Sequence, residues 1–141
     1  MKSVVIYALA FGGFVSGCAT NLQQNPYETL RLASVNLVDT YTQEIRIFLK
    51  DGNEQQALIK AKTVIENQLK DPLSAQFRNV MFKPYGSGTV VCGEVNGKNS
   101  YGAYNGFQRF VAGVYSASLY QSSQNSELDR YVNAGLQAAC G

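Results

Sequence analysis

Residues 77–96 read F-R-N-V-M-F-K-P-Y-G-S-G-T-V-V-C-G-E-V-N, and this stretch decides the fold. Its apolar residues alternate with period two over 77–82 and again over 89–96, which is typical of strands. Between them, residues 84–88 contain one proline and two glycines and predict a turn. Residues 107–115 predict a third strand, and three successive strands favour an antiparallel meander.

The segment 27–50 precedes the strands and predicts an amphipathic helix. Apolar residues recur in it at spacings of three and four: Leu30, Ala33, Leu37, Tyr41, Ile45 and Phe48. The second half has another interpretation, because Ile45, Ile47 and Leu49 alternate and β-branched residues are frequent there. A strand is therefore the alternative for that half.

A second helix is predicted to begin near Glu54 and to end at Asp71-Pro72. Asn53 and Gln56 form a capping-box pattern at its start, and the proline stops it at its end. Its apolar residues lie on one face: Ala57, Leu58, Ala61, Val64, Ile65 and Leu69.

A third helix is predicted over the last part of the sequence. Ser126 is expected as its N-cap, with Asp129 three residues later, and Gly141 stands where a C-cap glycine belongs. Its apolar face comprises Leu128, Tyr131, Val132, Leu136 and Ala139. The fold class expected is α+β, a small antiparallel three-stranded meander packed with two or three helices.

The N-terminus predicts an export signal. Lys2 is the only charge before an apolar and small-residue run over 4–15, which is too short to span a bilayer but long enough for a signal peptide. Val15-Ser16-Gly17-Cys18 resembles the lipobox of bacterial lipoproteins. The resemblance implies that residues 1–17 are removed and that Cys18 carries a diacylglycerol and an amide-linked acyl chain such as palmitate. Several acyl chains would anchor the protein stably to a membrane.

An ordinary secretory signal followed by an unrelated cysteine is the alternative. In a Gram-negative cell, Ala19 resembles the residue found in lipoproteins sorted to the outer membrane, which implies the periplasmic face of that membrane. Residues 18–26 are polar and predict a flexible tether. Residues 27–141 predict one globular domain.

The remaining cysteines predict a disulfide. With Cys18 lipidated, only Cys92 and Cys140 are left, an even pair in a protein exported to an oxidising compartment. No metal site is expected, because the chain contains no histidine and two thiols do not complete a zinc shell. A disulfide between Cys92 and Cys140 would link the last helix covalently to the central strand.

Composition argues against several function classes. Twelve basic and ten acidic residues are scattered without a basic stripe, so nucleic-acid binding is not expected. The absence of histidine removes the usual triads, and the glycines match neither a Walker loop nor a dinucleotide fingerprint, so we expect no cofactor. Glu94 and Asp71 are the candidate carboxylates for catalysis. We expect Glu94 to pair with Lys98 or Arg109 instead, and we predict no enzyme.

Two motifs carry a further resemblance. D-P-L-S-A-Q-F at 71–77 and V-C-G-E-V-N-G-K-N-S-Y-G-A-Y-N-G-F at 91–107 resemble the paired signatures of a family of small exported or phage-associated bacterial proteins of uncharacterised function. The resemblance spans 69–114. It implies an α+β domain and no particular activity.

The loop 96–107 is the predicted binding surface. It is rich in glycine and asparagine, and its candidate contact residues are Lys98, Asn99, Tyr101, Tyr104 and Phe107. The alternative is that the three rings fold over the sheet edge and complete the core, while Asn96 and Asn99 bond turn backbone.

The sequence therefore favours a membrane-anchored accessory module that binds a protein of the cell envelope. The alternatives are a phage-derived or defensive lipoprotein that blocks a receptor or channel, and a minor hydrolase.

Overall fold

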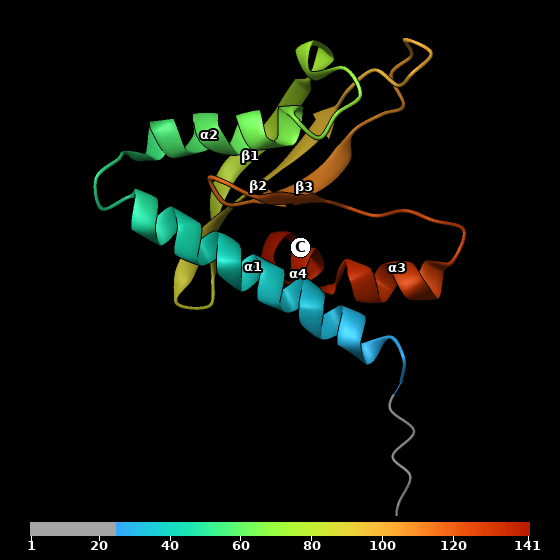
Figure 1. Cartoon of the computed structure of the whole chain (residues 1–141), viewed down its shortest axis with the longest axis horizontal. Coiled ribbons are helices and arrows are strands. Elements are labelled where there is room, and N and C mark those ends of the chain that lie inside the picture. The colour runs from blue at the N-terminus through green and yellow to red at the C-terminus, as the bar shows by residue number, and fades with distance from the viewer. Residues whose placement is uncertain (1–24) are drawn as a thin grey trace, which may run out of the picture.

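The computed structural model describes residues 25–141. Cys18 and the predicted signal peptide lie outside these residues. The described chain is α+β, with one antiparallel sheet in the order β1-β2-β3-β4 (Figure 1). The strands are β1 (Gln76–Tyr85), β2 (Gly88–Asn96), β3 (Gln108–Ala112) and β4 (Ala117–Leu119). The helices are α1 (Glu28–Phe48), α2 (Glu54–Glu66), the 3-10 turn η1 (Pro72–Ser74), α3 (Ser126–Val132) and α4 (Ala134–Cys140).

The fourth strand corrects the predicted three-stranded meander. The third strand was predicted to continue to Tyr115, but β3 ends at Ala112 and the chain turns back to form β4. One side chain of α1 fixes this turn: Glu44 Oε2 accepts the backbone N–H groups of Val114, Tyr115 and Ser116 at 3.1, 2.9 and 3.0 Å. The Ser116 hydroxyl also donates to Glu44. These contacts join residues 70 or more positions apart, so a local sequence pattern cannot predict them.

The helix α1 runs unbroken to Phe48, so the strand alternative for its second half is wrong. Its buried residues are Val38, Tyr41, Thr42 and Ile45, which follow a helical spacing. The first half differs from the predicted apolar stripe, because Leu30 and Leu37 are exposed.

The helix α2 confirms the capping-box prediction. Asn53 Oδ1 accepts the backbone N–H of Gln56 at 2.9 Å. Ala57, Ala61 and Ile65 of its inner face are fully buried. The helix ends at Glu66, before the predicted end at Asp71-Pro72, because the bonds change from i→i−4 at Asn67 to i→i−3 at Gln68 and Leu69.

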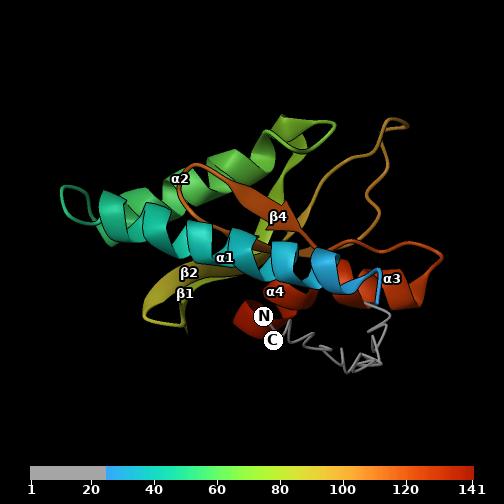
Figure 2. The same ribbon diagram turned by 60° about the horizontal axis from the view of Figure 1, so that its bottom comes forward.

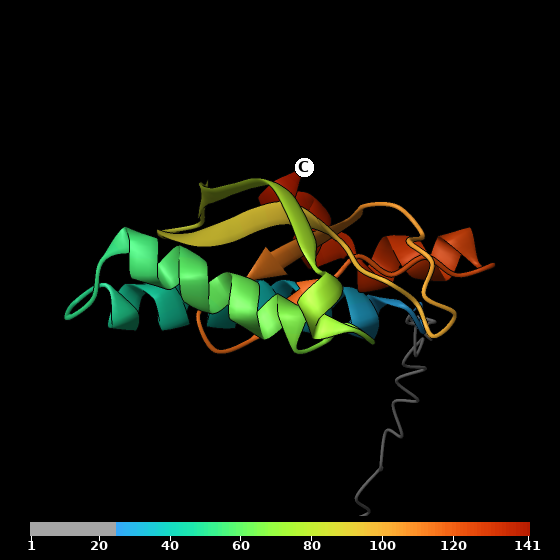
Figure 3. The ribbon, with the colours of Figure 1, turned by 90° about the horizontal axis from the view of Figure 1, so that it is seen from above.

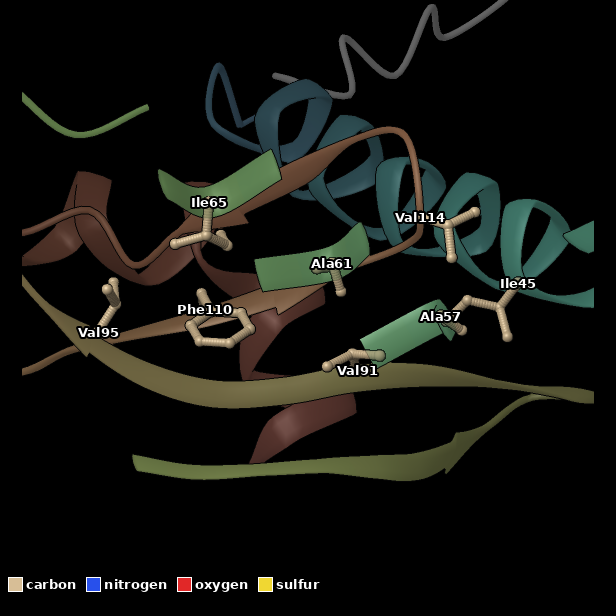
Figure 4. Close-up of a cluster of buried hydrophobic side chains, with 9 residues drawn as sticks. Ile45, Ala57, Ala61, Ile65, Val91, Val95, Phe110 and Val114 are labelled. Carbon is tan, nitrogen blue, oxygen red and sulfur yellow. The ribbon is translucent and has the colours of Figure 1, made fainter. Parts of the chain in front are cut away.

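The two faces of the sheet carry separate cores, with α2 on one face and α4 on the other (Figure 3). Adjacent residues of β2 point to opposite faces, so Val91 and Val95 pack under α2 while Val90 and Cys92 pack under α4. Figure 4 shows the α2 side, where Phe110 lies between the helix and β2. The helix α1 contributes to both cores and ties them together (Figure 2).

The predicted disulfide is present between Cys92 on β2 and Cys140 at the end of α4, with Cα atoms 5.6 Å apart. The bridge joins residues 48 apart in sequence, which contributes about 4 kcal/mol to stability in the chain-entropy model. Gly135 allows the close packing of α4 on α1, because a Cβ there would lie 2.2 Å from the carbonyl oxygen of Ser34.

The C-terminal helix differs from its prediction in two respects. The N-cap is Asn125, not Ser126, and its Oδ1 accepts the Leu128 N–H at 3.0 Å. The helix is also divided at Asn133, whose buried amide exchanges two hydrogen bonds of 2.7 Å with the backbone of Gln121. This pairing ties α3 and α4 to the segment that follows β4.

Among residues 25–141, no helix has the length and apolar character needed to cross a membrane.

Candidate functional site

The loop between β2 and β3 is ordered by Asn99. Its Oδ1 accepts the backbone N–H groups of Tyr101 and Ala103 at 2.9 and 3.1 Å, and its Nδ2 donates to Asn105 Oδ1 at 3.0 Å. Gly102 takes a φ of 78°, a conformation that favours glycine. Asn99, one of the predicted contact residues, is therefore half-buried and engaged within the loop.

The loop is also fastened to η1. The backbone N–H of Lys98 donates to Ser74 Oγ at 2.8 Å, and the Tyr104 hydroxyl donates to the Ser74 carbonyl at 3.1 Å. Lys98 and Tyr104 form an isolated antiparallel bridge, with the Lys98 ammonium 5.8 Å from the Tyr104 ring centroid. The loop and η1 are thus joined by hydrogen bonds, and both lie at the top of Figure 1.

Large apolar side chains on this surface are exposed. Leu73 is 100% exposed, Tyr101 95%, Tyr104 42% and Phe107 36%. The alternative that all three rings complete the core is wrong for Tyr101, whose ring lies almost entirely outside the fold. Only its backbone is held, by the bond to Asn99.

Phe107 lies against a charged pair at the base of the loop. The Arg78 guanidinium carbon is 4.0 Å from the Phe107 ring centroid, a cation–π contact. Arg78 also donates twice to the carboxylate of Glu94, at 2.8 and 3.0 Å, and Asn79 Nδ2 donates to Glu94 Oε2 at 3.0 Å. Hydrogen bonds from Arg78 and then Asn79 hold the pKa of Glu94 below its ordinary value.

This arrangement corrects the predicted partner of Glu94, which is neither Lys98 nor Arg109. Arg78 lies directly across from Glu94 in the β1–β2 register, and Asn79 has a φ of 55° in the bulge that follows. The bulge directs Asn79 to the same carboxylate. Both oxygens of Glu94 are therefore engaged by hydrogen-bond donors.

Arg109, the other predicted partner, makes different contacts. Its guanidinium carbon is 4.6 Å from the Tyr120 ring centroid, and its Nη2 donates to Gln137 Oε1 at 3.1 Å. A shallow groove of about 180 Å³ lies beside it, and its lining includes Met81, Glu94 and the disulfide.

We call the exposed area the loop surface. It comprises Leu73, Arg78, Lys98, Tyr101, Tyr104 and Phe107. Sequence reasoning missed Leu73 and Arg78. The Asp71-Pro72 pair indicates a turn at this position, but it does not decide which way the Leu73 side chain points. Arg78 required the strand register, which no local pattern contains.

Two further points concern metal-binding clusters and the second candidate carboxylate, Asp71. Within residues 25–141, no cluster of three or more cysteine, aspartate or glutamate side chains is arranged to hold a metal ion. Asp71, the second candidate carboxylate, precedes η1, where its backbone carbonyl accepts the Ser74 hydroxyl at 2.7 Å.

Comparison with known proteins adds no assignment. No family model, no curated protein sequence and no solved structure matches this chain.

Proposed function

We propose that the chain is a lipid-anchored protein of the bacterial cell envelope whose domain is a non-catalytic module that binds another protein through the loop surface. The observation that carries this proposal is the exposure of two neighbouring side chains, Leu73 on η1 and Tyr101 on the loop, whose backbone is held at several points. Tyrosine and arginine dominate the energetics of protein interfaces, and a held loop loses little entropy on binding.

The anchor and the loop surface fit one orientation. The described chain begins at residue 25 on the lower side of the molecule, whereas η1 and the loop 97–107 lie on the upper side (Figures 1 and 2). A lipid on Cys18 would hold the lower side near the membrane and leave the loop surface free for a partner. Mass spectrometry of the mature N-terminus tests the anchor, and an unmodified Cys18 would contradict it.

Capture of the partner from native membranes tests the binding surface. We expect the double variant Tyr101→Ala with Tyr104→Ala to lose crosslinked partner while its thermal transition stays nearly unchanged, because these rings carry little of the core. Tyr115→Ala is the matched control, since Tyr115 is 62% exposed but lies on the β3–β4 turn. Equal capture by the wild type, the double variant and Tyr115→Ala would place the binding surface elsewhere.

The same anchor and surface also suit the alternative of a lipoprotein that blocks a phage receptor or channel. Expression of the wild type and of the double variant in a phage-challenged host separates the two: protection by the wild type alone would favour that alternative.

A further inference from the structure

A groove lies between the first half of α1 and the pair α3 and α4, on the side of the domain where the described chain begins. We call it the tether groove. Its volume is about 470 Å³, and it is lined by Arg31, Arg130, Tyr131, Ala134, Gln137 and Ala138. Most of the surface that lines it is apolar, and two of its lining residues are arginines.

Contacts at residue 25 connect the groove to the tether. Asn25 Nδ2 donates to the Tyr131 hydroxyl at 2.8 Å, and the ring of Tyr27 stacks on Tyr131 with centroids 5.4 Å apart. Cys18 lies seven residues before Asn25, and seven extended residues span at most about 25 Å. A lipid on Cys18 would therefore keep the groove within that distance of the bilayer.

The charges of the groove suit phosphate. Arg130 has no ion-pair partner within residues 25–141, and its guanidinium carbon lies 5.2 Å from the Tyr131 ring centroid. Arg31 is bound by Glu28 at 2.6 Å. The carboxylate of Asp129, which neighbours Arg130 in sequence, accepts the Ser123 N–H at 2.8 Å. Arg130 is thus the arginine of the groove that no carboxylate of the described chain pairs with.

We propose that the tether groove rests on the phospholipid surface, with the Arg130 guanidinium bound to a lipid phosphate. This inference rests on the proposed lipid anchor. Guanidinium groups bind phosphate through paired hydrogen bonds, and tyrosine with a mostly apolar lining suits the boundary between headgroups and acyl chains. The domain then has a fixed orientation, with the loop surface facing away from the bilayer.

Single tryptophans test this orientation, because the chain contains none. Full-length lipidated variants Ala138→Trp and Leu73→Trp are bound to vesicles of phosphatidylethanolamine and phosphatidylglycerol, with or without bromine on the acyl chains. Ala138 is exposed in the groove, and Leu73 is fully exposed on the loop surface. We expect brominated lipid to quench Ala138→Trp several-fold more than Leu73→Trp. Gln137→Trp serves in the same way if Ala138→Trp does not fold.

Charge removal tests the phosphate contact. Added to Ala138→Trp, the change Arg130→Gln should reduce the quenching, whereas Lys98→Gln on the loop surface should leave it unchanged. Equal quenching at 138 and 73, quenching at neither, or no effect of Arg130→Gln would overturn the proposal. Failure of the wild type to sediment with vesicles is a different result, because it would overturn the lipid anchor itself.

Discussion

Two connections flank β3, one at each end, and in each of them one polar side chain accepts several backbone N–H groups. The loop 97–107 is held by Asn99, which lies within it. The turn 113–116 is held by Glu44, which reaches it from α1. The first loop is further fastened to Ser74 of η1 and to Arg78 at its base, and its three rings remain exposed. The second is part of the tertiary structure, and its order depends on the whole fold.

The disulfide lies in neither connection and joins β2 to α4, and its removal should have the largest effect on stability. We expect Cys92→Ala with Cys140→Ala to lower the free energy of unfolding by about 4 kcal/mol, measured by urea denaturation. Both thiols of the wild type should resist labelling under denaturing, non-reducing conditions. Full labelling of both thiols in protein taken from the envelope would show that the disulfide does not form there.

Changing Glu44 should separate the two connections. Glu44→Ala leaves three backbone N–H groups without their acceptor, and we expect a loss of about 2 kcal/mol in the free energy of unfolding. Glu44→Gln keeps an acceptor oxygen and should lose less. Partner capture by either folded variant should match the wild type. A loss of capture would mean that the two connections are coupled.

Changing Asn99 should give the opposite pattern. Asn99→Ala removes the bonds to Tyr101 and Ala103 but touches no core residue, so we expect only about 1 kcal/mol of destabilisation together with weak capture. Asn99→Asp retains the accepting oxygen and should restore most of the capture. If Asn99→Ala captures the partner as well as the wild type does, the order of the loop is irrelevant to binding.

The smallest effect concerns Glu94 at the base of the loop. Its pKa in the folded protein is below the ordinary 4.5, mainly because Arg78 donates to it. The pair therefore stabilises the fold above pH 4.5, and this contribution is lost as the pH falls through the lower folded-state pKa. Arg78→Gln should raise the pKa of Glu94 in an NMR titration of its carboxyl carbon. An unchanged titration would contradict the assigned partner, and Lys83→Gln is the control.

Local signals predicted the parts of the fold that local contacts form. Asn53 and Gln56 lie within one helical turn, so their capping pattern identified the start of α2. The strands β1 and β2 followed from their alternation and from the turn between them. The disulfide followed from an even number of cysteines, given lipidation of Cys18.

Contacts between distant residues caused the errors. The strand β4 depends on Glu44, and the break between α3 and α4 depends on the pairing of Asn133 with Gln121. In the candidate site, the sequence identified the loop and its rings but did not decide whether Tyr101 was core or surface. Ring spacing is the same in both cases, and only the exposed fraction of the side chain in the structure separates them.

Photo-crosslinking in intact cells tests the central claim most directly, that a lipid-anchored domain presents the loop surface to a partner protein. A photoreactive phenylalanine analogue at position 101 should give a discrete protein adduct, and the same analogue at position 115 should give none. The adduct at 101 should disappear when Cys18→Ser prevents anchoring. Equal adducts from 101 and 115, no adduct from 101, or an adduct that persists without Cys18 would contradict the claim.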